Sequence, residues 1–238
     1  MTRSREEQVY QAALRLFREQ GYHATSMQDI AEAVGLYKGS LYHYIAGKED
    51  LLARVFERAL GSLLADLERI AADTSACPSA QLRAVIRAHV AAVTDNLDAL
   101  TVYFHEWRAL SGESLATVRA QRERCAALVG EIVSRGVRLD EFHVPDVRLA
   151  TLGILGMCSW VCQWYRPSGR LGPREIADAF AELLLDGLRT GATRCDASAA
   201  QDQVADGVAQ RPHDGARLLA TQLVQEVAPE PLGGDLLG

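Results

Sequence analysis

Residues 25–44, TSMQDIAEAVGLYKGSLYHY, decide the fold of this chain. Apolar residues recur in this stretch at helical spacing, and Gly35 divides it into two short helices joined by a tight turn. Such a pair predicts a helix-turn-helix, whose second helix, over residues 38–44, enters the major groove of duplex DNA. Thr25 offers the N-cap of the first helix, and Gln28 follows three residues later at the spacing of a capping box.

The second helix of this pair has a polar face. Leu41 is expected to pin it to the first helix, and Ala31 lets the two helices approach closely. Its other side chains have groups that can reach phosphates or base edges. They are Tyr37, Lys38, Ser40, Tyr42, His43 and Tyr44. Short helix pairs with a glycine turn also occur in proteins that never touch DNA, so this geometry alone leaves both interpretations open.

Composition places the chain among soluble globular proteins. Of its 238 residues, 48% are hydrophobic and 24% are charged, and helix-forming residues are plentiful. The formal net charge is −6, which counts mildly against DNA binding, although a small head can hold the binding surface while a larger acidic domain masks it. Residues 2–47 hold as many acidic as basic side chains. We therefore expect modest affinity for random DNA and a dependence on dimerisation.

The sequence predicts neither secretion nor a membrane span. The first residues are charged and amphipathic, without the apolar core of a signal peptide, and no run of about 18 apolar residues occurs. The five cysteines are odd in number and lack metal-ligand spacing, so reduced thiols and a cytoplasmic location are expected. No HExxH motif, glycine-rich phosphate loop or nucleophile elbow appears. We therefore expect no catalytic site, no metal and no cofactor.

The run from residue 9 to residue 52 resembles the head of the tetracycline-repressor (TetR) family. The matching elements are Leu16-Phe17, Gly21-Tyr22, Thr25-Ser26, Ile30-Ala31, Gly35, Lys38-Gly39-Ser40-Leu41-Tyr42-His43-Tyr44 and Lys48-Glu49-Asp50-Leu51. The resemblance implies that the recognition helix reads the operator through Gly39, Ser40, Tyr42, His43 and Tyr44. It also implies that Thr25, Ser26 and Lys48 contact DNA at the starts of helices, where phosphates bind readily.

Two features depart from the family pattern. Tyr37 stands where a serine or threonine usually caps the recognition helix, and the loss of such a cap costs about 1 kcal/mol. The Tyr37 side chain either contacts the DNA backbone or packs against the protein. Ile45-Ala46-Gly47 replaces the usual Phe-Pro-Ser, so a looser hinge into the next helix is expected.

Helical patterns continue to about residue 190, so the predicted fold class is all-α with about nine helices. The resemblance implies a helix-turn-helix DNA-binding domain over residues 1–50 and a ligand-binding and dimerisation domain over residues 51–190. The composition of residues 191–238 predicts a disordered tail. In the family the last two helices build the dimer. The apolar stripes within residues 152–157 and 176–188 suit a four-helix seam across a twofold axis or the core of a single chain.

Residues 159–171, SWVCQWYRPSGRL, resemble the Trp-x-x-x-Trp-Tyr-[Arg/Lys]-Pro-x-Gly-x-Leu signature of one TetR branch. That branch includes regulators of fatty-acid and sterol catabolism that sense acyl-CoA thioesters. The resemblance implies ligand-binding roles for Trp107, Arg108, Trp160, Trp164, Arg166 and Arg170. Tryptophans can line an apolar tunnel, and arginines suit bidentate contacts with phosphates. The tryptophans can equally belong to a core or a dimer interface, and the arginines can simply be solvated.

These patterns together predict a homodimeric transcriptional repressor. It is expected to bind double-stranded operator DNA with two heads that reach successive major grooves about 34–36 Å apart. Its predicted small-molecule effector is an acyl-CoA thioester or a similar lipid metabolite. Two alternatives stay open: a repressor that senses a drug-like apolar molecule, and a helical enzyme or adaptor that has kept a degenerate head.

Overall fold

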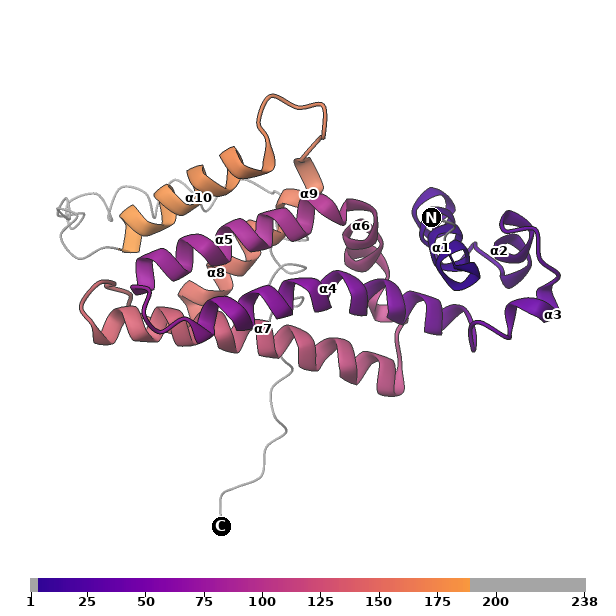
Figure 1. Cartoon of the computed structure of the whole chain (residues 1–238), viewed down its shortest axis with the longest axis horizontal. Coiled ribbons are helices and arrows are strands. Elements are labelled where there is room, and N and C mark those ends of the chain that lie inside the picture. The colour runs from indigo at the N-terminus through magenta and orange to yellow at the C-terminus, as the bar shows by residue number, and fades with distance from the viewer. Residues whose placement is uncertain (1–3, 189–238) are drawn as a thin grey trace, which may run out of the picture. The chain divides into compact units, whose positions relative to one another are not determined.

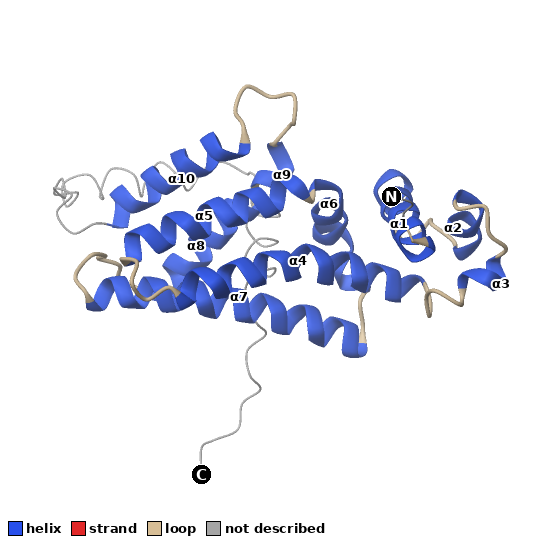
Figure 2. Ribbon diagram, in the orientation of Figure 1, coloured by secondary structure: helices blue, strands red, loops and turns tan. Residues whose placement is uncertain are grey.

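The computed structural model describes residues 4–188, and the regular elements in that range are helices (Figure 2). In chain order they are α1 (Arg5–Gln20), α2 (Met27–Ala33), α3 (Lys38–Leu41), α4 (Lys48–Ala72), α5 (Pro78–Asp95), α6 (Leu97–Glu106), the 3-10 helix η1 (Trp107–Ala109), α7 (Gly112–Arg138), α8 (Val147–Ser159), α9 (Val161–Trp164) and α10 (Pro173–Leu188). The all-α prediction is confirmed. The described range has ten α-helices, one more than predicted, because the expected helix over residues 147–165 breaks at Trp160. The predicted tail and Cys195 lie outside the described residues.

Local capping sets the ends of the first helices. Gly21 ends α1 with a φ of +86°, and Gly35 makes the turn after α2 with a φ of +66°, a region that favours glycine. The predicted cap of α2 is wrong by one residue. The Ser26 hydroxyl accepts from the Asp29 amide at 3.1 Å, and the Asp29 carboxylate accepts from the Ser26 amide at 2.8 Å. Thr25 does not cap because its hydroxyl donates to the Gly21 carbonyl at 2.8 Å.

The first three helices surround a small apolar core. Ala31 and Leu41 are completely buried, as predicted for a close helix approach and an inward anchor. The Leu36 amide donates to the Ala31 carbonyl at 2.9 Å and closes the turn between α2 and α3. The other buried side chains of this core come from α1, α2 and α4. They are Val9, Ala13, Phe17, Ile30 and Leu52. Packing on this core fixes α3, which is too short to be stable by itself.

The longer helices form a second bundle. Figure 1 shows α4 and α7 side by side and α5 next to α10, and these two pairs make the most extensive contacts in the described residues. Because α5 also contacts α7, α8 and α9, it lies at the centre of the bundle. The domain boundary predicted at residue 50 falls in the first turn of α4, so one helix serves both parts; the domain division itself stays a prediction. Within the described range no helix is long and apolar enough to cross a membrane.

The predicted dimer stripes contain both core and surface residues. Ile154 and Ile176 are buried within the chain, so for them the single-chain interpretation is right. Leu183, by contrast, is 66% exposed on α10, and Leu149 at the start of α8 is equally exposed. Exposed leucines on α8 and α10 leave an apolar surface that a second protomer can cover.

Gly136 provides a sharp test of packing in the second bundle. A Cβ at this position of α7 would lie 2.0 Å from Cδ2 of the buried Phe142 ring. Gly136→Ala is therefore expected to lower the free energy of unfolding by about 1–3 kcal/mol, the typical cost of overpacking. Gly61→Ala is the matched control, because Gly61 lies in α4 with no atom within 4 Å of a new Cβ. It should raise stability by about 0.5–1 kcal/mol. Urea denaturation measures both, and equal effects would contradict this packing.

Candidate functional site

Residues 37–44, which we call the recognition turn, present their polar side chains to solvent. Tyr37 is 87% exposed and Tyr42 is 50% exposed, while Leu41 between them is fully buried. Regular α-helix ends at Leu41 rather than at Tyr44 as predicted. The His43 and Tyr44 amides nevertheless donate to the carbonyls of Ser40 and Leu41, at 3.3 and 3.0 Å, so the segment stays hydrogen-bonded to its end.

The other predicted residues of this segment share that exposure to different degrees. Lys38, Gly39 and His43 are exposed, and Ser40 and Tyr44 are half-buried. Tyr37 occupies the N-cap position of α3 but makes no side-chain cap bond. Its high exposure agrees with a surface role and not with the packing role that the sequence left open. A short helix with exposed phenol, amine and imidazole groups has donors and acceptors suited to phosphates and base edges.

Thr25 and Ser26 lie at the start of α2 with opposite exposures. Thr25 is buried, and its hydroxyl accepts from the side-chain amide of Gln20 at 3.2 Å besides donating to the Gly21 carbonyl. Its side chain therefore serves the loop in the free protein. Ser26 is exposed, and its hydroxyl accepts from the Asp29 backbone amide at 3.1 Å. Hydrogen bonds that Ser26 donates to the Asp29 carboxylate, chiefly the one from its backbone amide, hold the pKa of Asp29 below its ordinary value.

Lys48 clamps the turn between α1 and α2, residues 21–25, from the side of α4. Its ammonium donates to the carbonyls of Tyr22 and Thr25 at 2.8 and 2.9 Å. The ammonium nitrogen also lies 4.3 Å from the centre of the Tyr22 ring, within the range of a cation–π contact. The structure thus directs Lys48 to the protein's own backbone; its contact with phosphate stays a prediction.

Glu106, at the end of α6, also bonds to this turn. Its carboxylate accepts from the Tyr22 amide at 3.3 Å and lies 3.7 Å from the His23 imidazole. Nearby, Arg18 of α1 pairs with Asp98 of α6 at 2.9 Å. Sequence reasoning did not identify Glu106, because a residue 84 positions away from its partner gives no local signal. These bonds connect the helix-turn-helix directly to α6.

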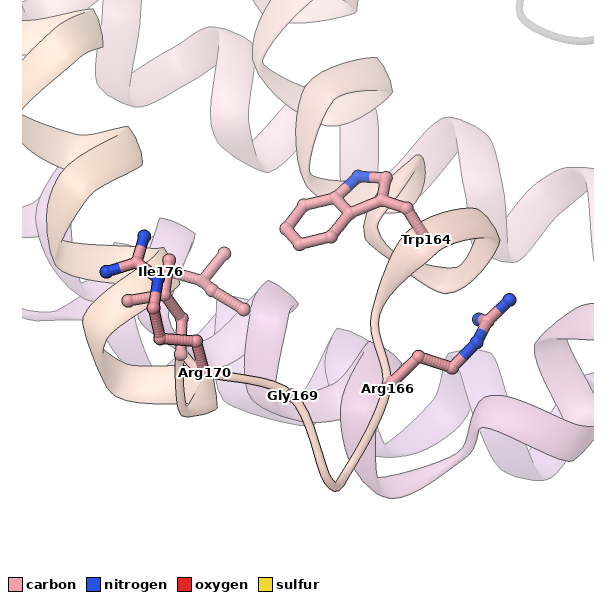
Figure 3. Close-up of a pocket in the computed structure, with 6 residues that line it drawn as sticks. Trp164, Arg166, Gly169, Arg170 and Ile176 are labelled. Carbon is pink, nitrogen blue, oxygen red and sulfur yellow. The ribbon is translucent and has the colours of Figure 1, made fainter.

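A second candidate site is a groove of about 240 Å³ in the loop between α9 and α10. Its lining residues are Trp164, Arg166, Gly169, Arg170, Leu171 and Ile176. Figure 3 shows the Trp164 ring directed toward Ile176, while Arg166 and Arg170 extend in opposite directions from the loop. The Arg166 guanidinium donates to the Tyr165 carbonyl at 2.9 Å. The groove therefore combines an apolar wall with two cationic side chains.

The groove brings together three of the six predicted ligand residues. Trp164, Arg166 and Arg170 line it, whereas Trp160, 41% exposed at the break between α8 and α9, does not. Trp107 and Arg108 lie on η1, where the Arg108 guanidinium is 4.9 Å from the centre of the Trp107 ring. These two residues contact each other and take no part in the groove.

Comparisons with known proteins assign most of the chain to one family of bacterial regulators. Residues 9–55 match the family model "Bacterial regulatory proteins, tetR family", and residues 75–188 match "Tetracyclin repressor-like, C-terminal domain". The transcriptional repressor KstR2 of Rhodococcus jostii (strain RHA1) is 29% identical over 187 residues, which cover 77% of this chain and 91% of that protein.

Two solved structures add to this agreement. The TetR-family regulator PfmR from Thermus thermophilus is 35% identical with a TM-score of 0.70, over 76% of this chain and 99% of PfmR. AibR, solved in complex with isovaleryl coenzyme A and operator DNA, is 30% identical with a TM-score of 0.69, over 76% of this chain and 98% of AibR.

The clamp formed by Lys48 predicts a stability difference between two lysines. Lys48→Met keeps most of the side-chain volume but removes the bonds to the Tyr22 and Thr25 carbonyls. It should lower the free energy of unfolding by about 1–2 kcal/mol, since charged hydrogen bonds exceed neutral ones in strength. Lys38→Met, on the exposed face of the recognition turn, is the control and should leave stability within about 0.5 kcal/mol. Guanidinium denaturation compares them; equal stabilities would argue against the clamp.

Proposed function

The chain belongs to the tetR family of bacterial regulatory proteins, and from that premise we propose that it is a homodimeric, effector-responsive repressor of transcription. The recognition turn carries this proposal: it is anchored by Leu41 and exposes Tyr37, Lys38, Tyr42 and His43. An anchored helix with an exposed polar face is what major-groove reading requires. The family is one of regulators, so no catalytic role is proposed.

We assign the DNA contacts by the chemistry of each exposed group. Tyr42 and His43 are the candidates for base edges, and Lys38 is a candidate for phosphate. Gly39 is exposed and has open space around its Cα, which allows the DNA backbone to approach closely. Ser26 supplies a hydroxyl donor at the start of α2.

The effector proposal is an acyl-CoA thioester. AibR was solved with such a thioester and with operator DNA together, and the groove between α9 and α10 offers suitable chemistry. Arg166 and Arg170 suit the phosphates of coenzyme A, while Trp164, Leu171 and Ile176 offer an apolar surface. Trp107, Arg108 and Trp160 remain candidates for other parts of the effector path.

Release of DNA requires that the effector bind one conformer more tightly than the other. We propose that α6 connects the two sites, because Glu106 and Asp98 bond to the turn and to α1 of the head. An effector that displaces α6 would change the direction of both heads of the dimer, and the grooves that they reach would no longer match the operator. We propose that the exposed apolar residues of α8 and α10, which include Leu149 and Leu183, form the interface with the second protomer.

Operator binding tests the recognition turn. Tyr42→Ala combined with His43→Ala should abolish sequence-specific binding, since each lost base contact costs about 1–3 kcal/mol and the dimer loses it twice. A gel shift on the DNA upstream of the protein's own gene measures this. His143→Ala, an exposed histidine in the loop before α8, is the control and should bind as the unaltered protein does. Undiminished binding by the double variant would refute the assignment.

Effector binding tests the groove. An acyl-CoA at about 100 times its Kd should stabilise the protein by about 2.7 kcal/mol, measured as a thermal shift. Arg166→Ala with Arg170→Ala should remove most of that shift, whereas Arg148→Ala, exposed on the first turn of α8, should keep it. A response to the same acyl group without coenzyme A would indicate the drug-like alternative. An unchanged shift in the double variant would exclude the groove.

A further inference from the structure

A buried polar pair, His89 and Ser159, lies inside the second bundle. His89 is in the middle of α5 and only 6% exposed. Its Nε2 is 3.2 Å from the hydroxyl of Ser159, the last residue of α8. The other ring nitrogen, Nδ1, is buried and has no hydrogen-bond partner among residues 4–188. One side of the imidazole is therefore satisfied and the other is not.

The unpaired nitrogen requires an explanation. Burial lowers the pKa of His89 to about 4, so the ring is neutral at physiological pH and has one N–H donor and one acceptor. When the Ser159 hydroxyl donates to Nε2, the proton is on Nδ1, and this donor faces no acceptor. Buried polar groups without a partner are rare in native proteins and cost stability. An apolar side chain would fill this position without that cost, which suggests that the histidine serves a ligand.

The pair lies on elements that pack against the walls of the groove between α9 and α10, although neither residue lines the groove itself. Only Trp160 separates Ser159 from α9, which ends with Trp164 of the groove wall. From the other side, Arg87 of α5 donates to Asp178 of α10 at 2.6 Å. On α10, Ile176 of the groove wall is two residues before Asp178. On α5, His89 is two residues after Arg87. The stretch of α5 that contains His89 therefore packs against the first turns of α10, which form one wall of the groove.

We propose that His89 is a binding residue for the effector and that its Nδ1–H donates a hydrogen bond to a carbonyl oxygen of the acyl group. In this proposal the Ser159 hydroxyl donates to Nε2, which places the ring proton on Nδ1, so Ser159 is a positioning residue. This inference rests on the proposed effector function of the groove. It adds that the acyl group of the effector carries a carbonyl oxygen that accepts a hydrogen bond from His89. The carbonyl is either that of the thioester or a ketone further along the acyl chain.

Two conservative variants separate the roles of the ring nitrogens. His89→Asn places an amide N–H near the position of Nδ1, whereas His89→Gln places one near Nε2 and removes the inner donor. Isothermal titration then compares isovaleryl-CoA, its thioether analogue without the carbonyl oxygen, and an acyl-CoA with a ketone in its chain. His143→Gln is the control, since this histidine is exposed in the loop before α8.

We expect the unaltered protein, the control and His89→Asn to bind the carbonyl compound with a Kd about tenfold lower than that of the matching compound without the carbonyl oxygen. We expect His89→Gln to lose this preference. If His89→Gln loses the preference for the thioester over the thioether, the bound oxygen is that of the thioester carbonyl. If it loses the preference for the ketone-bearing chain over the plain alkyl chain, the bound oxygen is that of the ketone. A preference that survives His89→Gln overturns the inference while leaving the effector proposal intact.

A different pattern marks failure of the proposed effector class. If no coenzyme A compound binds the unaltered protein, that class is wrong, and the same variants are titrated with the corresponding free ketones and alkanes. A carbonyl preference that depends on His89 in this series still supports the inference, and its absence overturns it. Thermal denaturation accompanies each variant; because Asn and Gln replace a neutral polar group of similar size, both should fold.

Discussion

The hydrogen bonding of the turn between α1 and α2 is the constraint on which the rest of the structure depends. Its carbonyls at Tyr22 and Thr25 accept from the Lys48 ammonium, and its amide at Tyr22 donates to the Glu106 carboxylate. Lys48 begins α4 and Glu106 ends α6, so two helices from outside the helix-turn-helix bond to one short loop. That loop leads directly into α2, and α2 fixes α3 through Ala31 and Leu41. The direction of the recognition turn is therefore set by groups outside the helix-turn-helix.

The parts of the fold that depend on local chemistry could be predicted from the sequence. Gly21 and Gly35 mark turns because a positive φ is needed there, and Leu41 is an anchor because its neighbours are polar. The capping residue of α2 could not be chosen with certainty, since Thr25 and Ser26 are both good caps. The choice depends on whether the Thr25 hydroxyl finds another partner, and the Gly21 carbonyl is available only after the loop has folded.

The candidate sites were predictable to different degrees for the same reason. The recognition turn is contiguous, so its residues could be identified together, and five of the six residues that line the groove come from one segment, residues 164–171. Glu106 and His89 could not be found in this way, because their partners Tyr22 and Ser159 are distant in sequence. The role of Lys48 could be assigned to phosphate by resemblance, but only the folded loop shows that its ammonium already has backbone acceptors.

The energies at the turn are of the right size for a regulated repressor. A coupling of about 1–3 kcal/mol per site is typical of allostery, and a hydrogen bond to a charged group is worth about 1.5–3 kcal/mol. The energy of a hydrogen bond such as the one from the Tyr22 amide to Glu106 is therefore comparable to a typical allosteric coupling free energy. Because α9 contacts α6 directly, the proposed ligand at Trp164 of α9 would act on the helix that ends at Glu106 through this one element. Two protomers double the effect, which approaches the roughly 5.5 kcal/mol that a nearly complete switch requires. Under the proposed mechanism, a single hydrogen bond in each subunit, placed where the head meets α6, would be enough to make DNA binding depend on what occupies the groove.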